Sequence, residues 1–275
     1  MIKTLYSLDS NWLPTGLELL NSDGVFVLDS VLDPSLCSQL VSAAKYSYDR
    51  IVSDIGVKRL QDAGESGVVR FPLKFRDEFS VLLCTPQVEE CVTRLLSPFA
   101  ICHLMNAILL EPAENSPTST SRLFQSTFHR DFPRYTGQLP LSLNSFYCLT
   151  DFNETNGSTQ FKLGSHRQSN SDLAAIGGPS VSVTAAVGSV IFFDSTIWHT
   201  GGTNLTASPR VGVNVQWTHH WIKQQIDLVR YLGIEMCERF SPQIRRRLGM
   251  ESRVVTSLDE YYVPPEHRLY KGGQG

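Results

Sequence analysis

The feature that most constrains the fold is a series of short β-type segments, separated by turns, that fills the middle of the chain. From about Ala100 onward, apolar runs of strand length alternate with connections rich in Gly, Asn, Ser and Pro. Many short strands of this kind indicate a sandwich or barrel rather than alternating strands and helices. The expected strands are Ile101–Leu110, Phe124–Asp131, Leu141–Asp151, Gln160–Leu163, Ser182–Ala185, Ser189–Asp194 and Val211–Thr218.

Helical segments flank this β region on both sides. Asp33 and Pro34 predict a helix start, because Asp caps the first turn and Pro suits the first helical position. A second helix is expected from Pro86 to Leu96, and a short buried strand follows the turn at Asp23 and Gly24. We therefore expect one domain over residues 1–275, with a helical part at about 30–98, a β core at about 100–218 and a helical tail at 219–275.

The charge balance argues against a strongly anionic partner. The chain has 24 basic and 27 acidic residues, which gives a formal net charge of −3. Proteins that bind nucleic acid or anionic membranes normally carry a basic surplus. The one basic run, Arg245–Arg247, is interpreted as the last turn of a helix that ends before Gly249. We therefore expect a small-molecule substrate and neither a nucleic-acid nor a membrane partner.

Cysteine usage and apolar patterning predict a cytoplasmic protein. The six cysteines form no C-x-x-C pair and are interpreted as reduced and mostly buried. No apolar run approaches the ~18 residues of a membrane span, and the first residues lack the apolar core of a signal peptide. We expect a monomer or a homodimer.

A candidate metal site begins with the tripeptide His129-Arg130-Asp131. In an extended chain the side-chain period is two, so His129 and Asp131 project to the same side. A distant His199 could supply a third ligand. Two His and one carboxylate form a facial triad, which leaves positions open on a non-haem iron. An H-x-D tripeptide alone is weak evidence.

The strand that follows His199 alternates cleanly. Its apolar residues fall on one face, and Arg210, Gly212, Asn214 and Gln216 fall on the other. That polar face could be solvated, or it could line a ligand cavity inside a barrel. The Arg210 guanidinium is suited to a carboxylate, because its planar fork binds both oxygens.

Four segments resemble the phytanoyl-CoA dioxygenase family of Fe(II)/2-oxoglutarate oxygenases. The likeness extends from about Asp23 to Trp217 and implies a mainly β fold with flanking helices, in which the core is a double-stranded β-helix (a cupin-like jelly roll). The four segments are Phe128–Asp131, Phe146–Phe152, Asn156–His166 and Gly188–Arg210.

The resemblance also implies roles for single residues. It places Fe(II) on His129, Asp131 and His199, and the distal carboxylate of 2-oxoglutarate on Arg210. Further cosubstrate contacts implied by the resemblance are Tyr147, Asn106 and Arg70. The chain departs from the family pattern at Arg130, Thr159 and Leu163, where Gln, Leu and Pro are common.

The resemblance implies a dioxygenase that consumes O₂ and 2-oxoglutarate and releases succinate and CO₂. The expected reaction is hydroxylation, desaturation or epoxidation of a small metabolite, in a biosynthetic pathway. Two alternatives stay open, namely an acyl-CoA hydroxylase of the same family and a non-catalytic jelly-roll protein that binds a metal or ligand. A serine hydrolase built on Ser165 and His166 is disfavoured, because the chain has no G-x-S-x-G elbow. His103 is interpreted as a satisfied core histidine.

Overall fold

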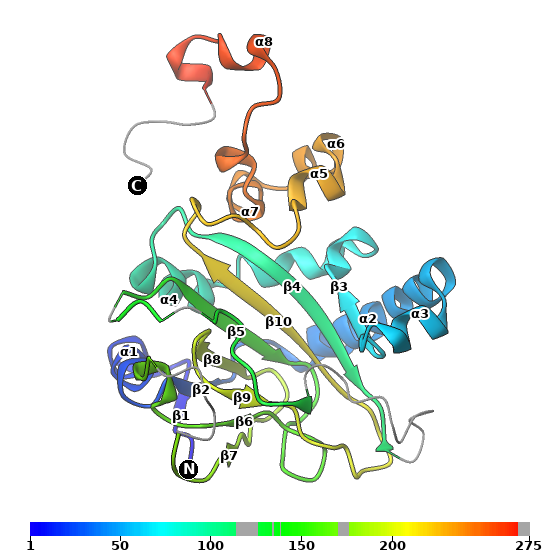
Figure 1. Ribbon diagram of the computed structural model, residues 1–275, viewed down its shortest axis with the longest axis vertical. Helices are drawn as coiled ribbons and strands as arrows, with labels where there is room; N and C mark the ends of the chain where they lie inside the picture. The colour runs from blue at the N-terminus through cyan, green and yellow to red at the C-terminus, as the bar shows by residue number, and fades with distance from the viewer. Residues whose placement is uncertain (114–125, 134, 138, 170–175, 269–275) are drawn as a thin grey trace.

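Two facing sheets form the centre of the computed structural model, which describes residues 1–275 except 114–125, 134, 138, 170–175 and 269–275 (Figure 1). Within the described residues the larger sheet has seven strands and the smaller has three, in the order β7 (Val181–Ser182), β6 (Gln160–Phe161), β9 (His199–Thr200). Across the larger sheet the order is β1 (Thr4–Tyr6), β2 (Val25–Asp29), β8 (Val190–Asp194), β5 (Ser142–Cys148), β10 (Arg210–Thr218), β4 (Ile101–Leu110) and β3 (Val68–Arg70).

The larger sheet has a helix-covered outer face and an inner face that meets the smaller sheet. Only β1 and β2 pair in parallel among the described strands of this sheet, and its other pairs are antiparallel. One apolar cluster packs the outer face against helices, and a second fills the space between the sheets. This arrangement confirms the expected jelly roll with flanking helices.

The helices form an N-terminal group and a C-terminal group, as Figure 1 shows by colour. The Asp33 cap is confirmed, because its carboxylate accepts the backbone N–H of Ser35 at 2.7 Å. No described helix has the length and apolar character needed to cross a membrane. The helices are α1 (Trp12–Ser22), α2 (Pro34–Ile55), α3 (Val57–Asp62), α4 (Pro86–Leu95), α5 (Leu228–Leu232), α6 (Ile234–Glu238), α7 (Pro242–Leu248) and α8 (Leu258–Tyr261).

Strand β10 lies between β5 and β4, so both of its edges are paired. Every one of its residues is buried. Val211, Val213, Val215 and Trp217 join the outer cluster, which leaves the polar residues facing the interior of the jelly roll. The polar face predicted from the sequence is therefore internal and not solvated.

The prediction of a strand over Phe124–Asp131 is wrong for residues 126–131, which the structure describes. Residues 124 and 125 lie outside the described residues, and His129 forms only an isolated antiparallel bridge with His199. The backbone N–H of each histidine donates to the carbonyl of the other, at 2.9 and 3.0 Å. One bridge is nevertheless enough to bring the H-x-D segment beside β9.

A buried ion pair ties the C-terminal helices to α4. The basic run Arg245–Arg247 does end α7, with Gly249 in the left-handed conformation at φ 91°. The Arg247 side chain is only 3% exposed, and its Nε and Nη2 donate to the two carboxylate oxygens of Glu89 at 2.6 and 2.8 Å. Arg247 also donates to the carbonyl of Ala100. The pair therefore holds α7 against α4 and the start of β4.

Replacing Arg247 with methionine should lower the free energy of unfolding by about 3–5 kcal/mol, because it leaves the Glu89 carboxylate half-buried without its cation. Urea unfolding measures this change. The matched control is Arg246→Met, whose half-exposed partner Glu251 predicts a loss below ~1 kcal/mol. Equal losses from both variants would show that the buried pair has no special role.

Candidate metal and cosubstrate site

Three side chains meet at one point between the two sheets. We call His129, Asp131 and His199 the candidate triad. Asp131 Oδ1 lies 3.4 Å from His129 Nε2 and 3.6 Å from His199 Nε2. One ligand atom from each residue lies within 4.8 Å of the other two. A single metal ion could therefore bind all three atoms.

The two imidazoles are held with the same nitrogen toward this point. His129 Nδ1 lies 2.8 Å from the carbonyl of Thr127, and His199 Nδ1 lies 3.0 Å from the carbonyl of Ile197. A carbonyl can only accept, so each Nδ1 carries the hydrogen, and in the neutral ring Nε2 keeps its lone pair. Backbone contacts of this kind orient metal-binding histidines in other proteins.

The electrostatics favour a charged carboxylate beside a neutral His199. Burial raises the pKa of Asp131, but the interactions with His199, the hydrogen bond with His129 and the Arg70 cation lower it more, so this pKa lies below its ordinary value. Burial lowers the pKa of His199, although Asp131 opposes the shift. Burial also lowers the pKa of His129, but its hydrogen bond with Asp131 outweighs this and the net shift is upward. A metal ion requires the deprotonated form of each ligand.

An aromatic cluster between the sheets supports His199 on one side and Arg210 on the other. The His199 ring lies 5.7 Å from Phe161 and 5.1 Å from Phe193, measured between centroids. These two rings belong to the same inner cluster as Phe146 and Phe152, over which the Arg210 guanidinium lies at 5.9 and 4.4 Å. Packing thus fixes both groups at the same time.

The Arg210 guanidinium is buried with two of its nitrogen atoms unpaired. The residue is 4% exposed, and its Nε and Nη1 have no hydrogen-bond partner among the described residues. Burial lowers the pKa of Arg210 to about 10, so the group remains a cation at neutral pH. An unpaired buried cation is costly, and a bidentate carboxylate would satisfy it. Asn214 Oδ1, on the same inner face, is also buried without a donor within the described residues.

Arg70 and Asn106 lie side by side on the inner face. They are direct neighbours in the pairing of β3 with β4. With its amide oxygen turned toward Arg70, Asn106 accepts from Arg70 Nη1 at 2.8 Å. Arg70 also pairs with Glu65 and is near enough to Asp131 to lower its pKa. The structure therefore brings both predicted residues toward the candidate triad.

The structure does not bring Tyr147 to the site. Tyr147 is fully buried in the outer cluster, and its hydroxyl donates to the carbonyl of Leu82 at 2.7 Å. It occupies the face of β5 opposite to Phe146 and Asn144, which point inward. Tyr147 is thus a packing residue beneath the helices, and the prediction that it contacts the cosubstrate is wrong.

His103 is a residue whose environment sequence reasoning missed. The pairing of β4 with β10 shifts by one residue between Gln216 and Trp217, which leaves His103 unpaired opposite the shift. His103 is half-buried, and its Nδ1 is buried with no partner among the described residues, so it is not a satisfied core histidine. Burial lowers the pKa of His103, although the charge of Asp131 opposes the shift. His103 therefore lies within electrostatic range of the candidate triad.

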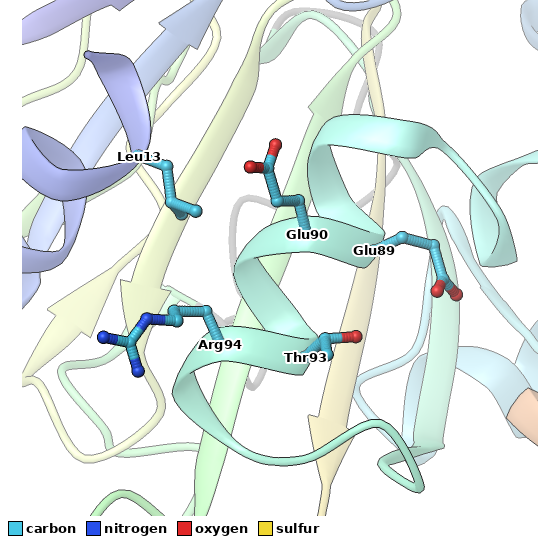
Figure 2. Close-up of a pocket in the computed structure, with 5 residues that line it drawn as sticks. All are labelled: Leu13, Glu89, Glu90, Thr93 and Arg94. Atoms are coloured by element: carbon cyan, nitrogen blue, oxygen red, sulfur yellow. The ribbon is translucent and has the colours of Figure 1, made fainter. Parts of the chain in front are cut away.

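A surface hollow of about 500 Å³ lies elsewhere, between α1 and α4 (Figure 2). Leu13, Glu90 and Arg94 line it, together with Glu89 and Thr93. Glu89 is already paired with Arg247. The hollow is wide open, and the residues that line it include no member of the candidate triad.

Comparison with known proteins finds relatives that match most of the chain. The chain is 39% identical over 259 residues to the uncharacterized protein Rv1501 of Mycobacterium tuberculosis, a match that covers 94% of each chain. It is 23% identical over 265 residues to the dioxygenase cdmA of Talaromyces verruculosus, which covers 92% of this chain and 88% of cdmA.

Solved structures share the fold. AviO1 from Streptomyces viridochromogenes Tue57 superposes with a TM-score of 0.57 at 21% identity, over 77% of this chain and 96% of AviO1. The α-ketoglutarate-dependent epimerase SnoN from nogalamycin biosynthesis superposes with a TM-score of 0.56 at 18% identity, over 76% and 82%.

The family model named phytanoyl-CoA dioxygenase (PhyH) matches residues 20–212, which include every residue of the candidate triad and Arg210. This match and the dioxygenase relatives support an oxygenase role, and therefore an oxidoreductase. The resemblance inferred from the four sequence segments is confirmed: the chain belongs to the phytanoyl-CoA dioxygenase family.

Proposed function

We propose that the chain is an Fe(II)- and 2-oxoglutarate-dependent dioxygenase that oxidises a small organic molecule. The observation that carries this proposal is that two features lie together inside the jelly roll. A two-His-one-carboxylate set lies on one side of an aromatic cluster, and on the other lies the buried Arg210 guanidinium, whose Nε and Nη1 find no partner in the described part of the chain. The first feature suits a divalent iron ion, and the second suits the free carboxylate of a dicarboxylic acid.

The protein residues have separate tasks in this proposal. His129, Asp131 and His199 hold the metal, and Thr127 and Ile197 keep the two imidazoles oriented through their carbonyls. Bound Fe(II) supplies the redox chemistry that couples decarboxylation of 2-oxoglutarate, with O₂, to oxidation of a substrate C–H bond. Only three protein ligands are needed, which leaves room for cosubstrate and O₂.

Arg210 orients the cosubstrate. Its stacking on Phe152 and Phe146 fixes the plane of the guanidinium before the ligand arrives, so little conformational freedom is lost on binding. The surrounding aromatic side chains exclude water, which strengthens the ion pair. Arg70 and Asn106 offer further polar contacts from β3 and β4 to the cosubstrate.

The presence of Asp131 favours hydroxylation, desaturation or epoxidation over halogenation. A halide would need a coordination position on the metal, and a carboxylate ligand occupies that position. The substrate is proposed to be a small metabolite of a biosynthetic pathway, with an acyl-CoA as the second candidate.

Two measurements test the proposal without knowledge of the substrate. Anaerobic addition of Fe(II) and then 2-oxoglutarate to the metal-free protein should produce a charge-transfer absorption band in the visible range. Admission of O₂ should then yield succinate above a protein-free blank, through slow uncoupled turnover. Succinate in place of 2-oxoglutarate is the matched control and should give no band. A protein that binds Fe(II) but gives neither band nor succinate would leave the non-catalytic alternative.

A further inference from the structure

Behind the candidate triad lies a second set of contacts that the proposed function does not use. Side chains alternate along an extended segment, so Arg130 projects to the face opposite to His129 and Asp131. By the same alternation Trp198 projects opposite to His199. Both residues are half-buried. The guanidinium carbon of Arg130 lies 5.1 Å from the centre of the Trp198 ring, so the two side chains stack.

Arg130 also binds the turn that follows β6. Its Nη2 donates to the carbonyl of Ser165 at 3.1 Å and to that of Gln168 at 3.0 Å. This turn is well fixed, because it forms the short 3-10 helix η5 (Ser165–Arg167), in which Ser165 is fully buried. Arg130 is thus attached at three points, two of them backbone oxygens.

The same turn also binds the strand that carries His199. The Ser165 hydroxyl accepts the backbone N–H of Trp198 at 2.9 Å. The carbonyl of Trp198 in turn accepts the backbone N–H of Lys162 at 2.9 Å. These contacts link Arg130 to Ser165 and Ser165 to Trp198, and the stacked side chains link Trp198 back to Arg130.

The two ligand-bearing segments do not pair as full strands within the described residues. An isolated bridge joins His129 and His199, and the Phe132 N–H donates to the carbonyl of Ser195. A single bridge fixes the distance between two segments better than their relative twist. The geometry of a metal site depends on that twist, because the three ligand atoms must face one point.

We propose that Arg130 is a positioning residue of the metal centre. Its stack on Trp198 and its two hydrogen bonds to the turn at 165–168 fix the segment that carries His129 and Asp131 against the strand that carries His199. This inference rests on the proposed function, since it assigns Arg130 a task in forming the metal site. A lysine could keep the charge, but it lacks the planar guanidinium that stacks on the Trp198 ring while its Nη2 donates to two carbonyls.

The test is a titration of the metal-free protein with Co(II), whose ligand-field absorption reports ligand geometry. Arg130→Met should weaken Co(II) binding by about 10- to 100-fold, the usual effect of losing a group that orients metal ligands, and should change the absorption spectrum. Arg130→Lys should recover part of the affinity. The matched control is Arg167→Met, which removes an exposed cation from the same turn and should leave affinity and spectrum unchanged.

Each outcome separates this inference from the proposed function. If the unaltered protein fails to bind Co(II), the metal centre itself is wrong. If the unaltered protein binds, and Arg130→Met binds with the same affinity and spectrum, the role of Arg130 is wrong while the metal centre stands. Should Arg130→Met fail to fold, Arg130→Lys and Trp198→Leu decide the question. Both variants should bind Co(II) more weakly than the unaltered protein and with a changed spectrum. If both titrate like the unaltered protein, the inference is wrong.

Discussion

Replacing Asp131 with alanine should abolish stoichiometric Fe(II) binding and, with it, the formation of succinate from 2-oxoglutarate. Asp131 is the only carboxylate of the candidate triad, and its Oδ1 lies within 3.6 Å of both imidazole Nε2 atoms. Its loss leaves two neutral nitrogen ligands, which cannot offset the charge of a divalent cation. Isothermal titration with Fe(II) under anaerobic conditions measures the effect directly, and His129→Ala should behave in the same way.

The matched control for the triad is Asp194→Asn. Asp194 ends β8, and its carboxylate accepts the backbone N–H and the hydroxyl of Thr196, so it supports the turn before β9 without belonging to the triad. Asp194→Asn should keep a 1:1 metal stoichiometry. If Asp131→Ala retains succinate formation at the rate of the unaltered protein, the assignment of the triad as the metal site is refuted.

Replacing Arg210 with methionine should raise the 2-oxoglutarate concentration needed for half-saturation by at least ~30-fold while leaving Fe(II) binding intact. Loss of one partner from a buried, hydrogen-bonded charge pair costs about 2–5 kcal/mol, and each ~1.4 kcal/mol corresponds to a factor of ten. The charge-transfer band titrated with 2-oxoglutarate measures the change. The half-saturating 2-oxoglutarate concentration of Arg210→Lys should fall between those of the unaltered protein and Arg210→Met, because lysine keeps the charge but loses the planar guanidinium.

The same substitution should stabilise the ligand-free protein. In Arg210→Met the buried, unpaired donors are removed, and each such unsatisfied group costs about 1–3 kcal/mol. Methionine can still pack against Phe146 and Phe152. The expected result is therefore a higher melting temperature without ligand, together with weaker cosubstrate binding.

An unchanged 2-oxoglutarate requirement in Arg210→Met would mean that another cation, such as Arg70, anchors the distal carboxylate.

The parts of the structure set by local sequence were predictable. The cap at Asp33 and the helix end at Gly249 depend on residues within one turn of each other, and both are confirmed. The alternation along β10 could be predicted from the sequence because its two faces differ in polarity. The convergence of His129, Asp131 and His199 was inferred from residue types and from the resemblance, and the structure brings the three together.

Other features depend on tertiary contacts that no local pattern records. Strand β5 is buried on both faces, so nothing in its sequence tells which face Tyr147 occupies. The environment of His103 results from a register shift against β10, a partner far away in the chain. Of the three consecutive arginines in α7, only Arg247 is buried, and helix packing places it against Glu89. Helix α1 was not predicted, and in the structure its N-cap residue Asn11 makes no side-chain cap hydrogen bond.

The place of β10 in the larger sheet has a consequence for how the chain must assemble during synthesis. This strand lies inside the sheet, between β5 and β4, although it is the last of its strands to be translated. Until it emerges, β5 and β4 each expose an unpaired edge, and such edges are prone to pair with other chains. At roughly 5–20 residues per second, the ribosome leaves these edges open for several seconds.

Folding of the nascent chain should therefore be late and cooperative, completed only when the carboxyl-terminal quarter is free. Pairings between strands far apart in the chain also slow the search for the native topology. A cell that produces this protein quickly should depend on chaperones that shield strand edges, and slower translation at low temperature should raise the recovered soluble fraction.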